Sequence, residues 1–422
     1  MLDDFMNRLP ELLAPVQNWH SLKMVKGIAD AIYFGVEDYN MRAKADNFKR
    51  DNLIKVTEFC HEQEPRMNAY LCTNILIYNN ELDDLEDLIS VAKDAGIDAI
   101  IAHDIAAIQI AKKMKVNFHI STQANVSNIE SAKFYEGLGA QRIILARELS
   151  LKQIGEIRKN LKSTEIECFV HGAMCTSISG RCYLSTTICD SEEFSANRGK
   201  CVQPCRRRWT VIDDDNNELI YDGLRFLNSK DLCMIEYIPE LMEANIDSFK
   251  IEGRMKDPLY AKTVVKCYRE AINSYREGTY SSAKVMDWLN RLKTVFNRGF
   301  HTGFYFHKPT IEEVELEEMG NISPYKKVYI GEIESFHETT MTANVLIENK
   351  GVPLKSGSEV LLKGMDTYHF ETVKKIFVSG KEVKEVVRND KDDPLKVNIR
   401  LTDKVLPQEK IFILTKNRNL KI

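Results

Sequence analysis

The chain has 422 residues, with 58 lysines and arginines against 62 aspartates and glutamates, which gives a formal net charge of −4. Its composition, 44% hydrophobic and 28% charged, is typical of folded domains and excludes disordered, collagen-like and coiled-coil proteins. No run reaches the ~18 apolar residues that a membrane span requires, because His103 and Asp104 interrupt the richest stretch. The first residues lack a basic region followed by an apolar run, so we expect no secretory signal, no membrane partner and a cytoplasmic location.

Short apolar runs alternate with amphipathic helical segments through the first part of the chain. The strand-like runs are Glu11–Pro15, Ala31–Val36, Asn68–Thr73, Ala99–Asp104, Asn117–Thr122, Arg142–Arg147, Glu167–Gly172 and Ser248–Gly253. Apolar strands joined by helices indicate a parallel sheet, and eight units over roughly 260 residues favour a closed (β/α)8 barrel of the TIM type. The absence of Gly-x-Gly-x-x-Gly after the first strand weakens the dinucleotide-binding alternative.

A long insertion separates the seventh and eighth strands. It covers residues 173–245 and leaves from the C-terminal end of its strand, which is the face where barrel active sites form. Near its end, Ser229 is predicted to cap the helix that contains Cys233. We assign residues 1–275 to the barrel with its insertion, 276–320 to a helical connector and 321–422 to a small β-barrel. This last segment has 18 basic and 14 acidic residues, which suggests an RNA-binding domain.

The ten cysteines are unevenly placed along the chain. Four of them lie in helical or strand-like patterns and are interpreted as packing residues: Cys60, Cys72, Cys168 and Cys267. Five others lie among Gly, Ser, Asn and Pro in the insertion: Cys175, Cys182, Cys189, Cys201 and Cys205. Disulfides are rare in a reducing cytosol, so this group indicates a metal or cluster site. The wide spacing favours an iron–sulfur cluster over zinc, and zinc stays open because Cys201 and Cys205 have knuckle spacing.

Polar residues gather where the predicted strands end, although a hydrophobic core would require valine or leucine there. The candidate catalytic residues are Arg147, Glu148, His171, Glu252 and Arg254. Because barrel strands end at one face, these side chains are predicted to form a polar cavity. The guanidinium groups beside carboxylates predict a site for a small carboxylated metabolite.

A basic segment surrounds the fourth and fifth cysteines of the insertion. Residues 198–208 carry five positive charges and no acid, and Trp209 comes directly afterwards. One interpretation is a solvated basic loop. The functional interpretation is an RNA-binding surface in which Arg206, Arg207 and Arg208 contact phosphates and Trp209 stacks on a base.

Several segments resemble one known family. Phe169-Val-His-Gly-Ala-Met-Cys175 with Thr-Ser-Ile-Ser-Gly-Arg-Cys182 resembles the signature of the collagenase-like peptidases of unassigned catalytic type, the family numbered thirty-two. Asn197-Arg-Gly-Lys-Cys201-Val-Gln-Pro-Cys205 and Phe249-Lys-Ile-Glu-Gly-Arg fit the same family, and the resemblance spans about residues 10 to 310. The sequence offers no obvious nucleophile–base pair for proteolysis.

The resemblance implies more than the spacing of the cysteines does. Similar members hold a 4Fe–4S cluster, and those with a C-terminal β-barrel resemble tRNA hydroxylation proteins. The implied reaction is the oxygen-independent, prephenate-dependent conversion of the tRNA wobble uridine into 5-hydroxyuridine. The implied cluster ligands are Cys175, Cys182, Cys201 and Cys233, with Cys205 as a fifth cysteine of the motif. A peptidase and a non-catalytic iron–sulfur RNA-binding factor stay open as alternatives, as does a partner subunit or homo-oligomer.

Overall fold

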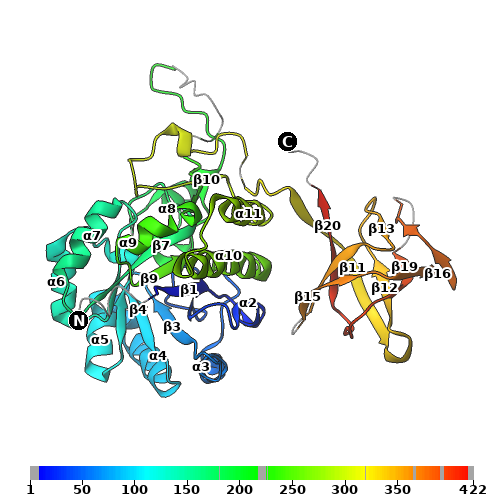
Figure 1. Ribbon diagram of the computed structural model, residues 1–422, viewed down its shortest axis with the longest axis horizontal. Helices are drawn as coiled ribbons and strands as arrows, with labels where there is room; N and C mark the ends of the chain where they lie inside the picture. The colour runs from blue at the N-terminus through cyan, green and yellow to red at the C-terminus, as the bar shows by residue number, and fades with distance from the viewer. Residues whose placement is uncertain are drawn as a thin grey trace. The chain divides into compact units, whose positions relative to one another are not determined.

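The computed structural model describes residues 9–179, 181–216, 225, 227–318, 320–364, 367–389 and 394–416. The chain divides into two units, Met1–Ile322 and Ser323–Ile422 (Figure 1). In the described ranges, no helix combines the length and the apolar character needed to cross a membrane.

Eight parallel strands in the described part of the first unit close into a barrel (Figure 1). They are β1 (Glu11–Pro15), β2 (Ala31–Phe34), β3 (Asn68–Thr73), β4 (Ala99–Ala102), β5 (Phe118–Ile120), β6 (Arg142–Ile144), β7 (Glu165–Ala173) and β9 (Ser248–Ile251). Each of β1 to β7 pairs with the next, and β9 pairs in parallel with both β1 and β7, which closes the ring. The predicted (β/α)8 barrel is therefore confirmed.

Helices cover the outside of this barrel (Figure 1). They are α2 (Trp19–Val25), α3 (Leu53–His61), α4 (Leu82–Asp94), α5 (Ile105–Met114), α6 (Ile129–Leu138), α7 (Leu151–Asn160), α9 (Ile238–Glu243) and α10 (Pro258–Arg276). Their caps are local: the Asp104 side chain accepts a hydrogen bond from the Ala106 amide at 2.9 Å and so begins α5. Asp104 thus serves as an N-cap at the end of its strand.

The insertion between β7 and β9 contains α8 (Leu184–Cys189) and a short strand, β8 (Asp231–Cys233). β8 runs antiparallel to β7 and pairs on its other side with β10 (Phe300–His301). The helix predicted to begin at Ser229 is therefore wrong, because two strands distant in sequence hold this segment extended. The seventh barrel helix, α9, begins later, with Pro239 in its first turn, a position that needs no amide donor.

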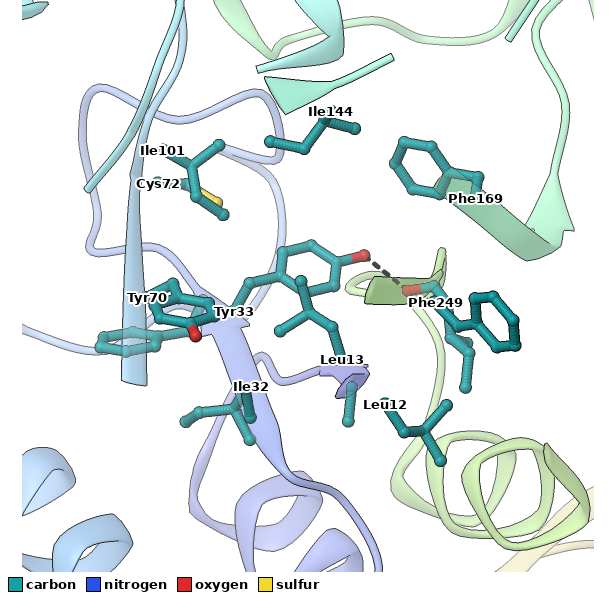
Figure 2. Close-up of a cluster of buried hydrophobic side chains, with 14 of the residues drawn as sticks. Leu12, Leu13, Ile32, Tyr33, Tyr70, Cys72, Ile101, Ile144, Phe169 and Phe249 are labelled. Carbon is teal, nitrogen blue, oxygen red and sulfur yellow. Dashed lines mark hydrogen bonds between the residues drawn. The ribbon is translucent and has the colours of Figure 1, made fainter. Parts of the chain in front are cut away.

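The barrel interior contains both an apolar cluster and a network of charged groups. Figure 2 shows Tyr33 reaching from β2 to the carbonyl of Ile251 on β9, at 2.8 Å. Fully buried Glu167 accepts hydrogen bonds from Lys250 Nζ at 2.8 Å and Arg142 Nη1 at 3.2 Å. Arg142 also contacts Glu11 at 2.5 Å, so the charges form one connected network across four strands.

The segment predicted as a helical connector, 276–320, belongs to the first unit. Its helix α11 (Ser282–Lys293) packs against α10 and buries Trp288. Farther along, Tyr305 donates a hydrogen bond from its hydroxyl to the Phe169 carbonyl of β7 at 2.5 Å. This segment therefore completes the packing around β7 and β8.

The second unit is an antiparallel sheet with its own apolar core. Its described strands are β11 (Tyr325–His337), β12 (Thr342–Ile347), β14 (Glu359–Lys363), β15 (Tyr368–Thr372), β16 (Lys375–Val378), β17 (Lys381–Val383), β19 (Leu395–Arg400) and β20 (Lys410–Lys416). A ribbon of β13 (Leu354–Lys355) and β18 (Glu385–Val386) accompanies them. Along β12, buried and half-buried side chains alternate, as expected for a sheet with one face on a core. The C-terminal unit, predicted as a small β-barrel over residues 321–422, is confirmed as a β fold, and its described strands form an antiparallel sheet ordered from β15 to β17.

The buried network supports a prediction about stability. Replacing Glu167 by Gln removes the negative charge beside the Lys250 ammonium, so the free energy of unfolding should fall by about 3–5 kcal/mol. Chemical denaturation of E167Q, K250M and the double variant measures this value. Because the double variant removes both charges, it should be less destabilised than the sum of the single changes. Simple additivity would show that the two charges do not stabilise each other.

Candidate functional site

Four cysteines of the insertion lie near one another. Electrostatic interaction links the Cys205 thiol with those of Cys175, Cys182 and Cys201. All four are free thiols, and each is exposed or half-buried. They come from separate turns of the insertion, including the 3-10 helix η6 (Pro204–Arg206) that carries Cys205. Three of the four cluster ligands implied by the family resemblance are thus brought together with the fifth cysteine of the motif.

Local contacts order the thiols of this cysteine group. The Gln203 amide lies 3.2 Å from Cys201 Sγ and donates a hydrogen bond to it. Burial is the largest effect on the pKa of Cys201 and of Cys205 and raises both. Neighbouring thiols also raise the pKa of Cys201 and of Cys205, so a bound cation or cluster would stabilise the thiolate forms. Sulfur ligands on a loop, with an amide donor to sulfur, fit an iron–sulfur cluster.

The other two cysteines of this region lie elsewhere. Cys233 ends β8, is buried, and has its Sγ 3.9 Å from the Tyr268 hydroxyl. Burial raises the pKa of Cys233 to about 12. Cys189 is half-buried at the last position of α8. The structure therefore places Cys233, the fourth implied ligand, against the aromatic packing of α10, where Tyr268 lies.

The mouth of the barrel centres on the Glu252 carboxylate. Arg42 Nη2 lies 3.0 Å from Glu252 Oε1, and Arg147 Nη2 lies 3.9 Å from Oε2. Burial raises the pKa of Glu252, but Arg42, Arg147 and Arg254 outweigh it and leave that pKa below its usual value. Glu252 is therefore a carboxylate surrounded by three guanidinium groups, as predicted for a site that holds an anion.

Arg254 is the least compensated of these cations. Only 2% of its surface is exposed, its Nη2 donates to Asn40 Oδ1 at 2.5 Å, and its Nη1 is buried without a hydrogen-bond partner among the described residues. A Cβ at Gly35 would lie 2.6 Å from this Nη1, so a side chain at residue 35 would displace the Arg254 guanidinium. A buried guanidinium N–H without an acceptor is costly, which favours a bound anion here.

Arg147 is fixed beside the same carboxylate. Its Nη1 donates to the Ala173 carbonyl at 2.8 Å, and its guanidinium lies 3.8 Å from the centre of the Phe169 ring. A pocket at the mouth is lined by Arg42, Arg147, Arg254 and Lys250 together with amide and hydroxyl side chains. These neutral polar residues are Asn74, Ser121, Thr122 and Gln123. The predicted polar cavity at the strand ends thus exists, and four cations line it.

Two predicted catalytic residues have other surroundings. Glu148 accepts a hydrogen bond from the Ser179 amide at 3.0 Å and so anchors the insertion. His171 is buried among Tyr260, Tyr268 and Phe300, and burial lowers its pKa to about 3. A group with this pKa stays neutral at physiological pH, so the environment of His171 favours packing over acid–base catalysis.

The predicted RNA-binding residues of the basic segment also differ from one another in their surroundings. Arg206 is buried and donates hydrogen bonds to Met174 O at 2.6 Å, Ser229 O at 2.5 Å and Asn228 Oδ1 at 3.1 Å. The prediction that it contacts phosphate is corrected, because it binds segments of the insertion to each other. Arg207, Arg208 and Trp209 are exposed.

The cysteine group and the barrel mouth touch through one segment, Asn40 to Arg42. The positive charge of Arg42 interacts with both Glu252 and Cys175. Gly199, next to Cys201 in the insertion, has φ +76°, and a Cβ there would lie 2.3 Å from the Asn40 carbonyl. Arg198 forms an ion pair with Glu81. The insertion is therefore seated directly on the loops that carry the mouth residues.

Sequence reasoning missed two mouth residues. Arg42 lies in the long loop after β2, whose length of more than ten residues was the available signal for a functional connection. Lys250 lies in the middle of β9, where a lysine between apolar neighbours signals a charged barrel interior.

Comparisons of this chain with a family model and with known proteins indicate the same family. A family model described as peptidase family U32 matches residues 17–315. The chain is 39% identical to an uncharacterized protease of Methanocaldococcus jannaschii, over 96% of this chain and 98% of that protein. It is 36% identical to a collagenase of Porphyromonas gingivalis, over 95% and 97%. It is 34% identical to tRNA hydroxylation protein P1 of Bacillus subtilis, over 94% and 93%.

The matched residues include the barrel from α2 onward, the cysteine group and every mouth residue described above. The three relatives align with nearly the whole chain, including most of the C-terminal sheet. The chain belongs to peptidase family U32.

Proposed function

We propose that this protein hydroxylates RNA, that its substrate is the wobble uridine of tRNA, and that its product is 5-hydroxyuridine. The observation that carries the proposal is the exposed cysteine group seated beside an arginine-lined barrel mouth. A relative that aligns over 94% of this chain is named a tRNA hydroxylation protein, which supports RNA modification as the reaction class. The reaction is proposed to need no molecular oxygen.

A 4Fe–4S cluster is the proposed cofactor. Cys175, Cys182 and Cys201 would hold it, with Cys233 as the fourth ligand by family resemblance and Cys205 as the competing choice by proximity. When bound, such a cluster supplies one-electron chemistry. The chain's own contribution is to orient the Cys201 thiol through the Gln203 amide and to provide the Arg42 cation, whose charge interacts with Cys175.

The mouth is the proposed site of a small carboxylated metabolite, with prephenate as the candidate co-substrate. Prephenate carries two carboxylates, and Arg147 and Arg254 both line the pocket that contains Glu252. The buried, unpartnered Nη1 of Arg254 is the most specific support, because a carboxylate oxygen would satisfy it.

A peptidase is the competing function, since two relatives carry protease or collagenase names. A cysteine peptidase needs a thiol whose pKa is lowered by a neighbouring base. Burial instead raises the pKa of Cys201 and Cys205, and the His171 ring is enclosed by aromatic side chains. These surroundings favour hydroxylation over proteolysis.

The proposed cofactor predicts the behaviour of the protein purified without oxygen. It should be brown, with about four irons and four sulfides per chain. Cys175→Ser, Cys182→Ser and Cys201→Ser should each lose most of the iron. Of C205S and C233S, the variant that loses iron identifies the fourth ligand, and C267S, in the buried packing of α10, is the matched control. A colourless protein with one zinc per chain would refute the cluster.

The proposed reaction predicts a change in cellular tRNA. Deleting the gene should abolish 5-hydroxyuridine and its derivatives at the wobble position, as measured by nucleoside mass spectrometry. The native gene should restore them, whereas a C175S gene should not. An unchanged nucleoside pool in the deletion strain would exclude this function. Proteolysis by the pure protein, lost in C175S, would establish the peptidase in its place.

The mouth predicts a specific effect on metabolite affinity. Arg254→Met should weaken prephenate binding by about tenfold or more, because a charged hydrogen bond is removed from a buried site. Calorimetric titration measures the dissociation constant, and R276M, an exposed position late in α10, is the control. Equal affinity of R254M and the native protein would place the metabolite elsewhere.

A further inference from the structure

Exposed apolar side chains are concentrated on one stretch of the insertion. Of the large hydrophobic residues that the described chain leaves exposed, these lie between residues 178 and 212: Ile178, Tyr183, Ile188, Trp209, Val211 and Ile212. Isolated exposed apolar residues are normal, but a group around a candidate active site indicates a binding surface. Two exposed rings and three exposed cations of this stretch are together called the aromatic rim: Tyr183, Trp209, Lys200, Arg207 and Arg208.

The two rings of the aromatic rim flank the cysteine group. Tyr183 directly follows Cys182, and 66% of its surface is exposed. Trp209 is 37% exposed and its Nε1 donates to the Pro204 carbonyl at 2.9 Å, next to Cys205. This hydrogen bond fixes the indole while leaving part of its surface in solvent. Each ring is therefore close in sequence to a cysteine of the group, Tyr183 to Cys182 and Trp209 to Cys205.

The turns that carry the two rings are held together. The Cys182 amide donates to Asn197 Oδ1 at 3.1 Å, and the Val202 amide donates to Ser185 Oγ at 3.1 Å. Helix α8, which begins directly after Tyr183, packs against η6, which contains Cys205. The rings are therefore presented by connected turns, which limits the ordering that binding would require.

The charges of the rim are positive. Lys200, Arg207 and Arg208 are exposed, and among the residues that the structure describes none of them forms an ion pair. The acids of this stretch, Asp190, Glu192 and Glu193, follow the C-terminal end of α8. Six helical residues separate them from Tyr183, which is about 9 Å of helix. The exposed aspartates Asp213, Asp214 and Asp215 follow Trp209 after three further residues, so the positive charge of the rim is confined to the acid-free segment 199–209.

We propose that the aromatic rim binds single-stranded RNA, with Tyr183 and Trp209 stacking on bases on either side of the cysteine group and the three cations contacting phosphates. This inference rests on the proposed function for its choice of RNA, and it names the surface that presents the substrate. Unpaired bases in loops stack on exposed aromatic rings, whereas bases in a duplex are not available. Because Tyr, Trp and Arg are also common at protein interfaces, binding of a protein is made an outcome of the test.

The test measures RNA affinity with the anaerobically purified full-length protein. The probe is a fluorescein-labelled single-stranded RNA of twelve nucleotides containing uridines, and the comparison probe is a twelve-base-pair RNA duplex. Y183A and W209A should each weaken binding of the single strand about tenfold, since each removes one stacked base. Y183F and W209F, which retain a ring, should bind within about twofold of the native protein. Phe134→Ala is the matched control, because Phe134 is an equally exposed ring on α6.

Salt dependence tests the cations separately. R207A with R208A should lower the slope of log affinity against log salt by about 1.4, which is the value expected for two lost phosphate contacts on a single strand. An unchanged slope would remove these arginines from the surface. Iron content and melting temperature of every variant verify that the cysteine group and the fold are intact.

Several outcomes would overturn the inference. They are Y183A and W209A affinities within twofold of the native value, equal binding of duplex and single strand, or loss of self-association in W209A with RNA affinity unchanged. The last result would identify a second copy of the chain as the occupant. Hydroxylated nucleosides are measured in parallel, so the two ideas fail independently. Normal hydroxylation by Y183A and W209A would refute the rim alone, whereas ring-dependent binding without hydroxylation would refute the proposed function alone.

Discussion

Polar and charged side chains alternate with apolar ones along β9 and into Glu252, and both the barrel and its mouth depend on this pattern. In a strand, alternate side chains face one side, and here Ser248, Lys250 and Glu252 share the inner face. Because β9 joins β1 to β7, the charged groups of Lys250 and Glu252 cannot leave the interior without opening the ring. Each therefore needs an internal partner: Lys250 has Glu167, and Glu252 has Arg42. The same strand that closes the fold thus fixes the electrostatics of the candidate site.

Most of the barrel could be predicted from sequence, because strands buried on both faces are continuous apolar runs with capped helices between them. The strand ends also predicted Arg147, Glu252 and Arg254 as neighbours, since parallel strands end at one face. What could not be predicted depends on contacts between distant segments. β8 is extended because β7 and β10 pair with it. Arg206 is buried because carbonyls from two other segments surround it, although its sequence resembles a basic surface loop.

The mouth and the cysteine group share parts, so neither can be understood alone. Asn40 accepts from Arg254 on one side, while its carbonyl lies against Gly199 of the insertion on the other. At this point the chain has no room for a side chain at residue 199. A loop that arises between β2 and α3 is thereby held by an insertion that arises more than a hundred residues later. Because the position of this loop depends on segments distant in sequence, Arg42 gave only a weak signal in the sequence, although it contacts Glu252.

Arg42 also links the charges of the two sites. Its guanidinium lies 3.0 Å from Glu252 and interacts with the Cys175 thiol. An anion at the mouth would compete with Glu252 for the surrounding guanidinium groups, and negative charge on the cysteine group would draw on the same Arg42. A negative charge bound at either place would therefore change the electrostatic cost of binding one at the other, because one cation serves both. Through this single side chain the cysteine group and the barrel mouth share one positive charge.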